Sequence, residues 1–192
     1  MVTVAKAKRE SSIVGVVKAG LPPIARPDAR LFILGSLPGE ASLAAQRYYA
    51  HPQNQFWRLV GSAIDKDLST LPYERRLERL AEHRIGLWDV IGSAERRGSL
   101  DQSIRNANHN RIEQLLHEYP ALEAIAFNGG KSATVGRKLL ESAAGLTLID
   151  LPSSSPANTQ SFAEKAKAWA RLAPFCGAAS CAAASTGRNV NP

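Results

Sequence analysis

Short apolar runs that stop at glycine or proline recur along the chain. The first, Leu31–Leu34, does not alternate with polar residues and is followed by the loop Gly35–Gly39. Continuous apolar runs of this length are typical of strands that are buried on both faces of a sheet. We predict four such strands, at Leu31–Leu34, Ile85–Ile91, Ala124–Phe127 and Leu146–Leu151.

Between these runs, apolar residues recur at the spacing of one helical face. Pro52 is expected to begin a helix, because proline is favoured at the first helical position, and Phe56, Val60 and Ile64 follow at every fourth residue. Asn158 is expected to cap the last helix. The other helices are predicted from their inward-facing residues: Tyr73, Leu77 and Leu80; Ile112, Leu115, Leu116 and Tyr119; Val135, Leu139 and Leu140; Phe162, Ala166, Trp169 and Leu172.

Strands and helices therefore alternate about four times, which predicts an α/β fold with a parallel sheet between layers of helices. We divide the 192 residues into a basic flexible arm at 1–25, a single domain at 26–175 and a disordered tail at 176–192. Glycine and proline interrupt the arm at positions 20, 22 and 23, and the tail is mostly Ala, Ser and Gly.

The charge of the chain suggests a class of partner without deciding it. The formal net charge is +7, and six basic against two acidic residues up to position 30 supply more than half of it. A basic surplus favours polyanions such as nucleic acid, because phosphates release counterions when the protein binds. It fits a solvated basic tail equally well.

Composition and motifs exclude several other classes. Cys176 and Cys181 lie in the last 17 residues, and two thiols cannot complete a four-cysteine iron–sulfur or structural zinc site. The sequence contains no P-loop, dinucleotide fingerprint, H-E-x-x-H or G-x-S-x-G motif. It also lacks a secretory signal and any apolar run of about 20 residues. We expect a cytoplasmic protein that uses no metal or cofactor and does not enter a membrane.

Each predicted strand ends in an unusual loop. Taken alone, each loop could be an ordinary turn, a core residue or a helix cap. In a parallel sheet, however, all four would meet at the edge formed by the carboxyl ends of the strands, where α/β proteins bind their ligands. The loops are Gly35–Gly39, Trp88-Asp89, Asn128–Lys131 and Leu151–Pro156.

The most specific segment is Tyr48–Trp57, which reads YYAHPQNQFW and follows the first of these loops closely. Aromatic rings beside carboxamides suit a flat heterocycle, which needs a stacking face and hydrogen-bonding edges. Together with GSLPGEASL at 35–43, this segment resembles the uracil-DNA glycosylase superfamily over roughly residues 31–172. The likeness is greatest to the hypoxanthine/deoxyinosine branch, the sixth family, or to a uracil-excising member with an extended first motif.

The resemblance implies a three-layer α/β/α fold with a central four-stranded parallel sheet, and a groove that receives a nucleotide flipped out of DNA without any metal. It implies that Tyr49 is a stacking platform and that Asp89 stands where the superfamily has a base-reading carboxamide. The base pocket would then be formed by Ser36, Leu37, Pro38, Gly39, Tyr49, Trp88 and Asn128, and DNA would be bound by Lys131, Ser153, Ser154, Ser155 and Asn158.

The chain departs from the superfamily at two positions. Leu37 stands where most members have the Asp or Asn that orients the attacking water, and Leu151 replaces a common histidine. In the branch that the chain resembles, the asparagine of HPQN takes the water-positioning role, which here is Asn54. His51 and Asp89 are the other candidate catalytic residues, as proton acceptors.

These observations lead to one expected function and two alternatives. We expect a monomeric, monofunctional DNA glycosylase that removes uracil and leaves an abasic site. The first alternative is removal of hypoxanthine from deoxyinosine, since both bases present a carbonyl beside an N–H. The second is a nucleic-acid-binding protein on the same fold that has lost catalysis.

Overall fold

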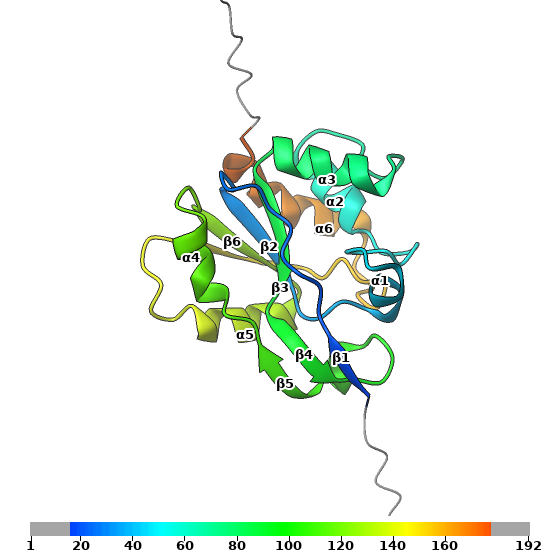
Figure 1. Ribbon diagram of the computed structural model, residues 1–192. Coiled ribbons are helices and arrows are strands. Elements are labelled where there is room, and N and C mark those ends of the chain that lie inside the picture. Colours follow the sequence, from blue (N-terminus) through cyan, green and yellow to red (C-terminus); the bar gives the residue numbers. More distant parts are fainter. Residues whose placement is uncertain (1–15, 178–192) are drawn as a thin grey trace, which may run out of the picture.

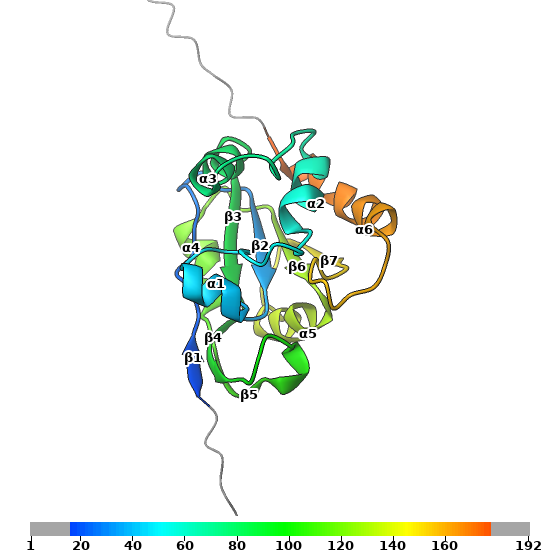
Figure 2. The same cartoon turned by 90° about the vertical axis from the view of Figure 1, so that its right-hand side faces the viewer.

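The computed structural model describes residues 16–177 and contains a central sheet of four parallel strands. Their order across the sheet is β3-β2-β6-β7, which Figure 2 shows from one side to the other. This confirms the predicted parallel sheet. Its strands are β2 (Leu31–Gly35), β3 (Ile85–Asp89), β6 (Ala124–Asn128) and β7 (Thr147–Leu151).

The strand register brings the predicted loops together. Gly35 pairs with Asp89 at the ends of β2 and β3, and Asn128 pairs with Leu151 at the ends of β6 and β7. The loops that follow the four strands therefore all begin at the same edge of the sheet. This is the edge at which open α/β sheets bind ligands.

Helices cover both faces of the sheet, so the architecture is three-layered, as expected (Figures 1 and 2). Ile33, Leu87 and Ala126 face one core cluster, whereas Phe32 and Leu34 face the other. The first face is covered by α2 (Phe56–Ala63), α3 (Tyr73–Glu82), α6 (Phe162–Trp169) and the 3₁₀ turn Ala170–Phe175; the second is covered by α4 (Leu115–Glu118), the 3₁₀ turn Ile112–Gln114 and α5 (Gly130–Leu139).

A second, three-stranded sheet was not predicted. The apolar run at 85–91 divides into two strands, because Ile85–Asp89 pairs with β2, whereas the strand that begins at Ile91 pairs with the strands of the second sheet. The strands of this antiparallel sheet, in the order β1-β4-β5, are β1 (Val17–Ala19), β4 (Ile91–Glu95) and β5 (Arg105–His109).

The prediction of a flexible arm is wrong for residues 16–25. Strand β1 pairs with β4, Leu21 is buried in the core, and Ile24 forms an antiparallel bridge with Leu87. This segment is ordered because it completes the second sheet and covers apolar surface. Residues 1–15 and 178–192, the rest of the predicted arm and most of the predicted tail, lie outside the described residues.

Two helix starts also differ from prediction. Helix α2 begins at Phe56 rather than Pro52, since the Asn54 side chain accepts the Phe56 amide hydrogen and Pro52 lies in the preceding turn. Helix α6 begins at Phe162, where Ser161 and Glu164 form a capping box. Asn158 is therefore not the cap. A short helix, α1 (Glu40–Ala45), and a 3₁₀ turn at Asp101–Ser103 were not predicted.

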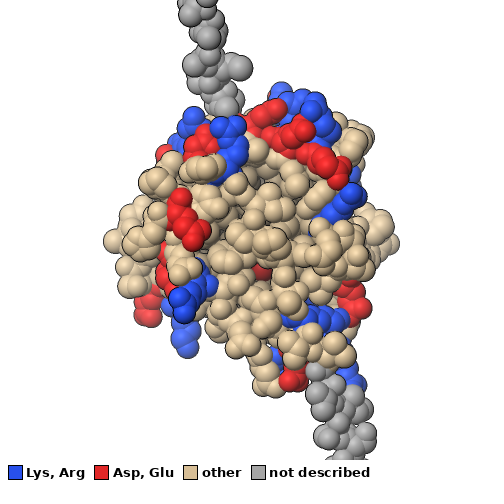
Figure 3. Space-filling model, viewed as in Figure 1, with Lys and Arg blue, Asp and Glu red and all other residues tan. Residues whose placement is uncertain are grey.

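Charged side chains do not form one basic patch on the face shown in Figure 3. Lys and Arg lie mainly around the rim of this face and are mixed with Asp and Glu. Three of the basic residues that gave the sequence its N-terminal surplus, Lys6, Lys8 and Arg9, lie outside the described residues. Within the described residues, no helix is long and apolar enough to cross a membrane.

Candidate active site

Gly35 leaves room for two polar side chains at the carboxyl edge of the sheet. A Cβ atom placed on Gly35 would overlap with Asp89 Oδ1 and would lie 3.3 Å from the Tyr49 hydroxyl. Only glycine therefore lets the Asp89 carboxylate and the Tyr49 ring approach the end of β2 together. These residues lie on the sheet face covered by α2 and α6, since Asp89 follows Leu87 with the two-residue period of a strand.

The Tyr49 ring is held from one side by an aromatic neighbour. It stacks on Phe56 with 3.6 Å between ring centroids and 8° between ring planes, so a further flat group could stack only on its other face. Tyr49 has a left-handed φ of 53°, which few non-glycine residues adopt and which is frequent at functional sites. Its hydroxyl is buried without a hydrogen-bond partner among the described residues, and burial raises its pKa.

Asp89 is a buried carboxyl group without an ion-pair partner. Its exposed fraction is 4%, and its Oδ2 atom has no hydrogen-bond partner within the part of the chain that the structure describes. Burial raises the pKa of Asp89 to about 7; the nearby Arg96 charge opposes this shift and Asp101 adds to it. An unpaired polar atom in such a place costs folding free energy, which suggests that a ligand completes it.

The loop Gly35–Gly39 presents backbone groups to the site more than side chains. Ser36 Oγ donates to Asp101 Oδ1 at 2.6 Å, and Pro38 is buried. Leu37 packs into the core on the opposite face of the sheet, where its side chain does not reach Asp89. The buried Arg96 donates to the carbonyls of Leu37 and Pro38 and so fixes the path of the loop. Gly39, the last residue of the loop, accepts the Leu43 amide at the start of α1.

Trp88 does not join the other predicted base-binding residues. It precedes Asp89 in β3, and successive side chains of a strand point to opposite faces. Its half-buried ring therefore packs against the α4–α5 side of the sheet. The position of Trp88 therefore fits its interpretation as a core residue.

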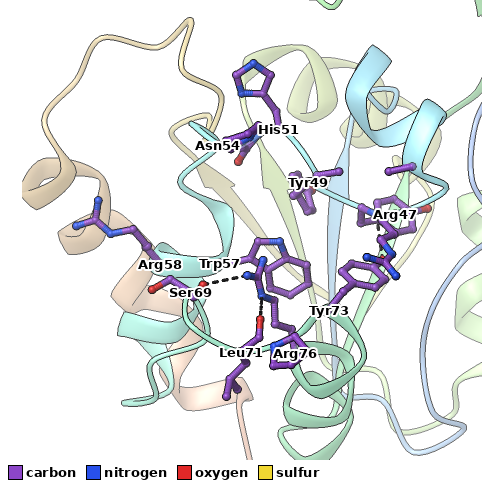
Figure 4. A pocket seen from close by; sticks show the side chains of 15 residues that line it. Arg47, Tyr49, His51, Asn54, Trp57, Arg58, Ser69, Leu71, Tyr73 and Arg76 are labelled. Carbon is purple, nitrogen blue, oxygen red and sulfur yellow. Dashed lines mark hydrogen bonds between the residues drawn. The ribbon is translucent and has the colours of Figure 1, made fainter.

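Asn54 and His51 lie together in the turn before α2 (Figure 4). The Asn54 Oδ1 atom accepts the Phe56 amide at 2.9 Å, which leaves Nδ2 without a hydrogen-bond partner among residues 16–177. His51 is exposed, and its Nδ1 atom accepts the Gln53 amide at 3.2 Å. The hydrogen bonds thus hold Asn54 by its oxygen and direct its amide N–H groups outward.

Asn128 binds Ser154 through both ends of its amide. Its Nδ2 donates to Ser154 Oγ, and its Oδ1 accepts the Ser154 amide, both at 2.8 Å. The Gln55 amide donates to the Ser154 carbonyl at 3.0 Å. Ser154 is 1% exposed, so it joins three segments instead of presenting its hydroxyl to a phosphate. Asn128 acts here as a connection between β6 and the loop after β7.

The other predicted DNA-binding residues surround this connection. Ser153 and Ser155 accept amide hydrogens two residues further along the chain, and Asn158 donates to the Ser153 carbonyl at 3.1 Å. These bonds shape the loop into successive turns. Lys131 is exposed in the first turn of α5.

A cavity of about 460 Å³ lies beside the segment Tyr48–Trp57 (Figure 4). Tyr49, His51 and Asn54 form part of its wall, whereas Gly35, Asp89 and Asn128 do not line it. The cavity and the Asp89 site are therefore neighbours that share the Tyr49–Asn54 segment. Its remaining wall comes from α2, α3 and the segment between them, including Arg58, Ser69 and Arg76.

The burial of two basic residues near the site, Arg96 and Lys165, was not predicted from the sequence. Arg96 gave no sequence signal because it belongs to an ordinary basic pair with Arg97. Lys165 did give one: it stands on the apolar face of α6, three residues after Phe162 and four before Trp169. No group of three or more His, Cys, Asp or Glu in residues 16–177 could hold a metal ion.

Comparisons with known proteins place this geometry in a family. The sequence model of the Uracil DNA glycosylase superfamily matches residues 22–173. Two relatives are named "Hypoxanthine DNA glycosylase": that of Methanosarcina barkeri is 40% identical over 153 residues, and that of Methanosarcina acetivorans is 39% identical over 154. Each alignment covers 80% of this chain and 96% of the relative.

A solved structure supports the same assignment. The solution NMR structure of a "putative Uracil DNA glycosylase" from Methanosarcina acetivorans is similar to this chain with a TM-score of 0.74 and 38% sequence identity. The match covers 82% of this chain and 96% of that protein. The likeness therefore extends over the whole sheet and the loops at its carboxyl edge.

The burial of Asp89 predicts a pH-dependent change in stability. Its pKa is higher in the folded chain than in the unfolded one, so its contribution to stability is complete below about pH 4 and is lost as the pH rises through about 7. Asp89→Asn should therefore raise the free energy of unfolding at pH 8, on the order of a few kcal/mol, and much less at pH 5. Urea denaturation at both pH values measures this; an equal effect at both would contradict it.

Proposed function

The chain belongs to the uracil-DNA glycosylase superfamily, and from this premise we propose that it is a DNA glycosylase that removes hypoxanthine from deoxyinosine. Water would attack C1′ of the deoxyribose, the N9–C1′ bond would break, and the base would leave with the bonding electrons and take up a proton. The product is an abasic site. The observation that carries the proposal is the unpaired, buried Asp89 carboxyl beside the stacked Tyr49 ring.

Hypoxanthine takes the place of uracil as the main candidate because of the relatives. Two proteins that match this chain over 96% of their length carry the name hypoxanthine DNA glycosylase. Uracil remains the second candidate, since the similar solved structure is named a "putative Uracil DNA glycosylase" and both bases offer an N–H beside a carbonyl. Loss of catalysis is the third outcome that an assay must separate.

Asn54 is proposed to orient the attacking water. Its Oδ1 atom is already held by the Phe56 amide, so Nδ2 can donate to the oxygen of a water in a fixed direction. Cleavage through an oxocarbenium-like state needs an oriented water more than a strong base. This arrangement compensates for Leu37, whose side chain is in the core.

His51 fits a contact with DNA better than a role as proton acceptor. In the neutral ring one nitrogen accepts and the other donates, and Nδ1 already accepts the Gln53 amide. Nε2 then carries the proton and can donate to a phosphate or sugar oxygen. Lys131 and the turns at Ser153, Ser155 and Asn158 are proposed to contact phosphates of the same DNA strand.

Asp89 is proposed to read the base edge. An ionised carboxylate accepts the N1–H of hypoxanthine, whereas adenine has no proton on N1 and would place two acceptors face to face. In a buried site such a mismatch leaves polar groups unpaired and is strongly disfavoured. Guanine shares the N1–H, so its exclusion depends on the space available for its 2-amino group.

The proposal is tested by incubating the protein with matched duplexes that contain inosine, uracil or no damaged base. Alkali then cleaves the abasic strand, and a denaturing gel measures the product. We expect cleavage at inosine to be faster than at uracil, in keeping with the two relatives named hypoxanthine DNA glycosylase. Cleavage at uracil alone would favour the second candidate, and cleavage of neither duplex would favour a binding protein.

Replacing Asn54 tests the position of the water. Asn54→Ala should lower the single-turnover rate about 10²-fold or more, the effect of losing one preorganised polar group, with little change in DNA affinity. Gln53→Ala is the matched control, because Gln53 is the exposed neighbour in the same turn. A rate near that of the wild type for Asn54→Ala would rule out this role.

Replacing Tyr49 tests stacking. Tyr49→Ala should weaken capture of the flipped base by roughly 1–3 kcal/mol, and Tyr49→Phe should retain it, because the ring face carries the interaction. Fluorescence titration with an inosine duplex measures both variants. If phenylalanine were as damaging as alanine, the buried hydroxyl and not the ring would be responsible.

The raised pKa of Asp89 predicts the pH profile of excision. The carboxylate is the better acceptor for N1–H, so the single-turnover rate should rise as Asp89 ionises, between about pH 6 and pH 8. Asp89→Asn should be slower and should lack this rise. An unchanged profile in the variant would show that Asp89 does not read the base.

A further inference from the structure

Lys165 is a buried cation without a counter-ion. It lies on α6 with 1% of its surface exposed, and no carboxylate of the described residues lies within ion-pair distance. The neighbouring Glu164 is exposed and is bound to Ser161. Burying an unpaired charge reduces the stability of the fold, so the burial of Lys165 calls for a structural or functional explanation.

The ammonium group instead holds two segments of the site. Its Nζ atom donates to Gln55 Oε1 at 3.0 Å and to the Asn158 carbonyl at 2.8 Å. Gln55 directly follows Asn54, and Asn158 lies in the loop between β7 and α6. Lys165 is thus the link between the turn that carries the proposed water-orienting residue and the loop proposed to hold DNA phosphates.

The link continues through the backbone of the same residues. The Gln55 amide donates to the Ser154 carbonyl at 3.0 Å, so Gln55 is fixed from its side chain by Lys165 and from its main chain by the loop after β7. A small displacement of Gln55 would move Asn54 with it. Positioning errors of about 1 Å can cost about 10²-fold in rate.

We propose that Lys165 is a positioning residue of the glycosylase: its ammonium group holds Gln55 and Asn158 so that Asn54 and the phosphate-binding loop act on the same nucleotide. This inference rests on the proposed function. Lys165 itself is buried beneath both segments and does not touch the reacting atoms. Burial also lowers its pKa, as expected for a charge kept in place by carbonyl oxygens alone.

The test compares Lys165→Met with Lys167→Met, the same substitution two residues further along α6 at an exposed position. Lys165→Met should lower the single-turnover rate on an inosine duplex, measured with the DNA fully bound, about 10-fold or more. Lys167→Met should leave the rate unchanged. A wild-type rate in folded Lys165→Met would overturn the proposal.

A double-mutant cycle separates positioning from general damage. In an Asn54→Ala background, Lys165→Met should lower the rate by no more than about 2-fold further, because both changes act on the same water. An equally large loss in both backgrounds would mean that Lys165 only supports the fold. If Lys165→Met does not fold, Gln55→Met removes the acceptor from the opposite side and should give the same pattern.

Hydrogen exchange makes the test independent of activity. Without DNA, Lys165→Met should speed exchange of the Gln55 and Asn158 amides relative to Lys167→Met, and unchanged exchange would overturn the proposal. An inactive wild-type protein with this exchange pattern would disprove the proposed function but not the link. An active wild-type protein with unaltered variants would disprove the link alone.

Discussion

The site depends on the way Ser154 joins three segments of the chain. Its amide and hydroxyl bind the two ends of the Asn128 amide, and its carbonyl accepts the Gln55 amide. The end of β6, the loop after β7 and the turn before α2 are thereby fixed to one buried residue. Parallel pairing brings these segments to the same edge of the sheet, but it does not set the distances between them. The hydrogen bonds of Ser154 do, and Lys165 adds a second connection on the far side of Gln55.

Several features at the carboxyl edge of the sheet reduce the stability of the free protein. Within the described residues, one Asp89 oxygen and the Tyr49 hydroxyl are buried without a hydrogen-bond partner, and Tyr49 has a left-handed backbone. Each feature is unfavourable in the free protein, and the fold tolerates them because two extensive core clusters support the sheet. A base that supplies an N–H to Asp89 and a ring face to Tyr49 would satisfy the site. Under the proposed function, the same unpaired acceptor would disfavour adenine, which has no proton on N1.

The sequence predicted the parallel sheet because its four apolar runs are buried on both faces and stop at glycine or proline. The second sheet could not be predicted: β5 reads RNANH, is largely exposed, and pairs only because β4 leaves the main sheet at Val90. Within the site, the resemblance to the uracil-DNA glycosylase superfamily indicated Tyr49, Asn54 and Asp89 as candidate residues. It also suggested Trp88 and the Leu37 side chain, which strand alternation and core packing direct to the other face. The burial of Arg96 and Lys165 was not predicted, because the hydrogen bonds that hold Arg96 leave no sequence motif and the place of Lys165 on the apolar face of α6 was overlooked.

In the proposed function, a flipped hypoxanthine lies against Tyr49 with its N1–H edge toward Asp89. The most direct test is a crystal structure of the Asn54→Ala protein bound to an inosine-containing duplex, in which the base should remain uncleaved. We expect a hypoxanthine ring on the face of Tyr49 opposite Phe56, with its N1 atom within hydrogen-bond distance of Asp89 Oδ2. A base left in the helix, or bound in the cavity beside Trp57 and Tyr73 away from Asp89, would contradict it.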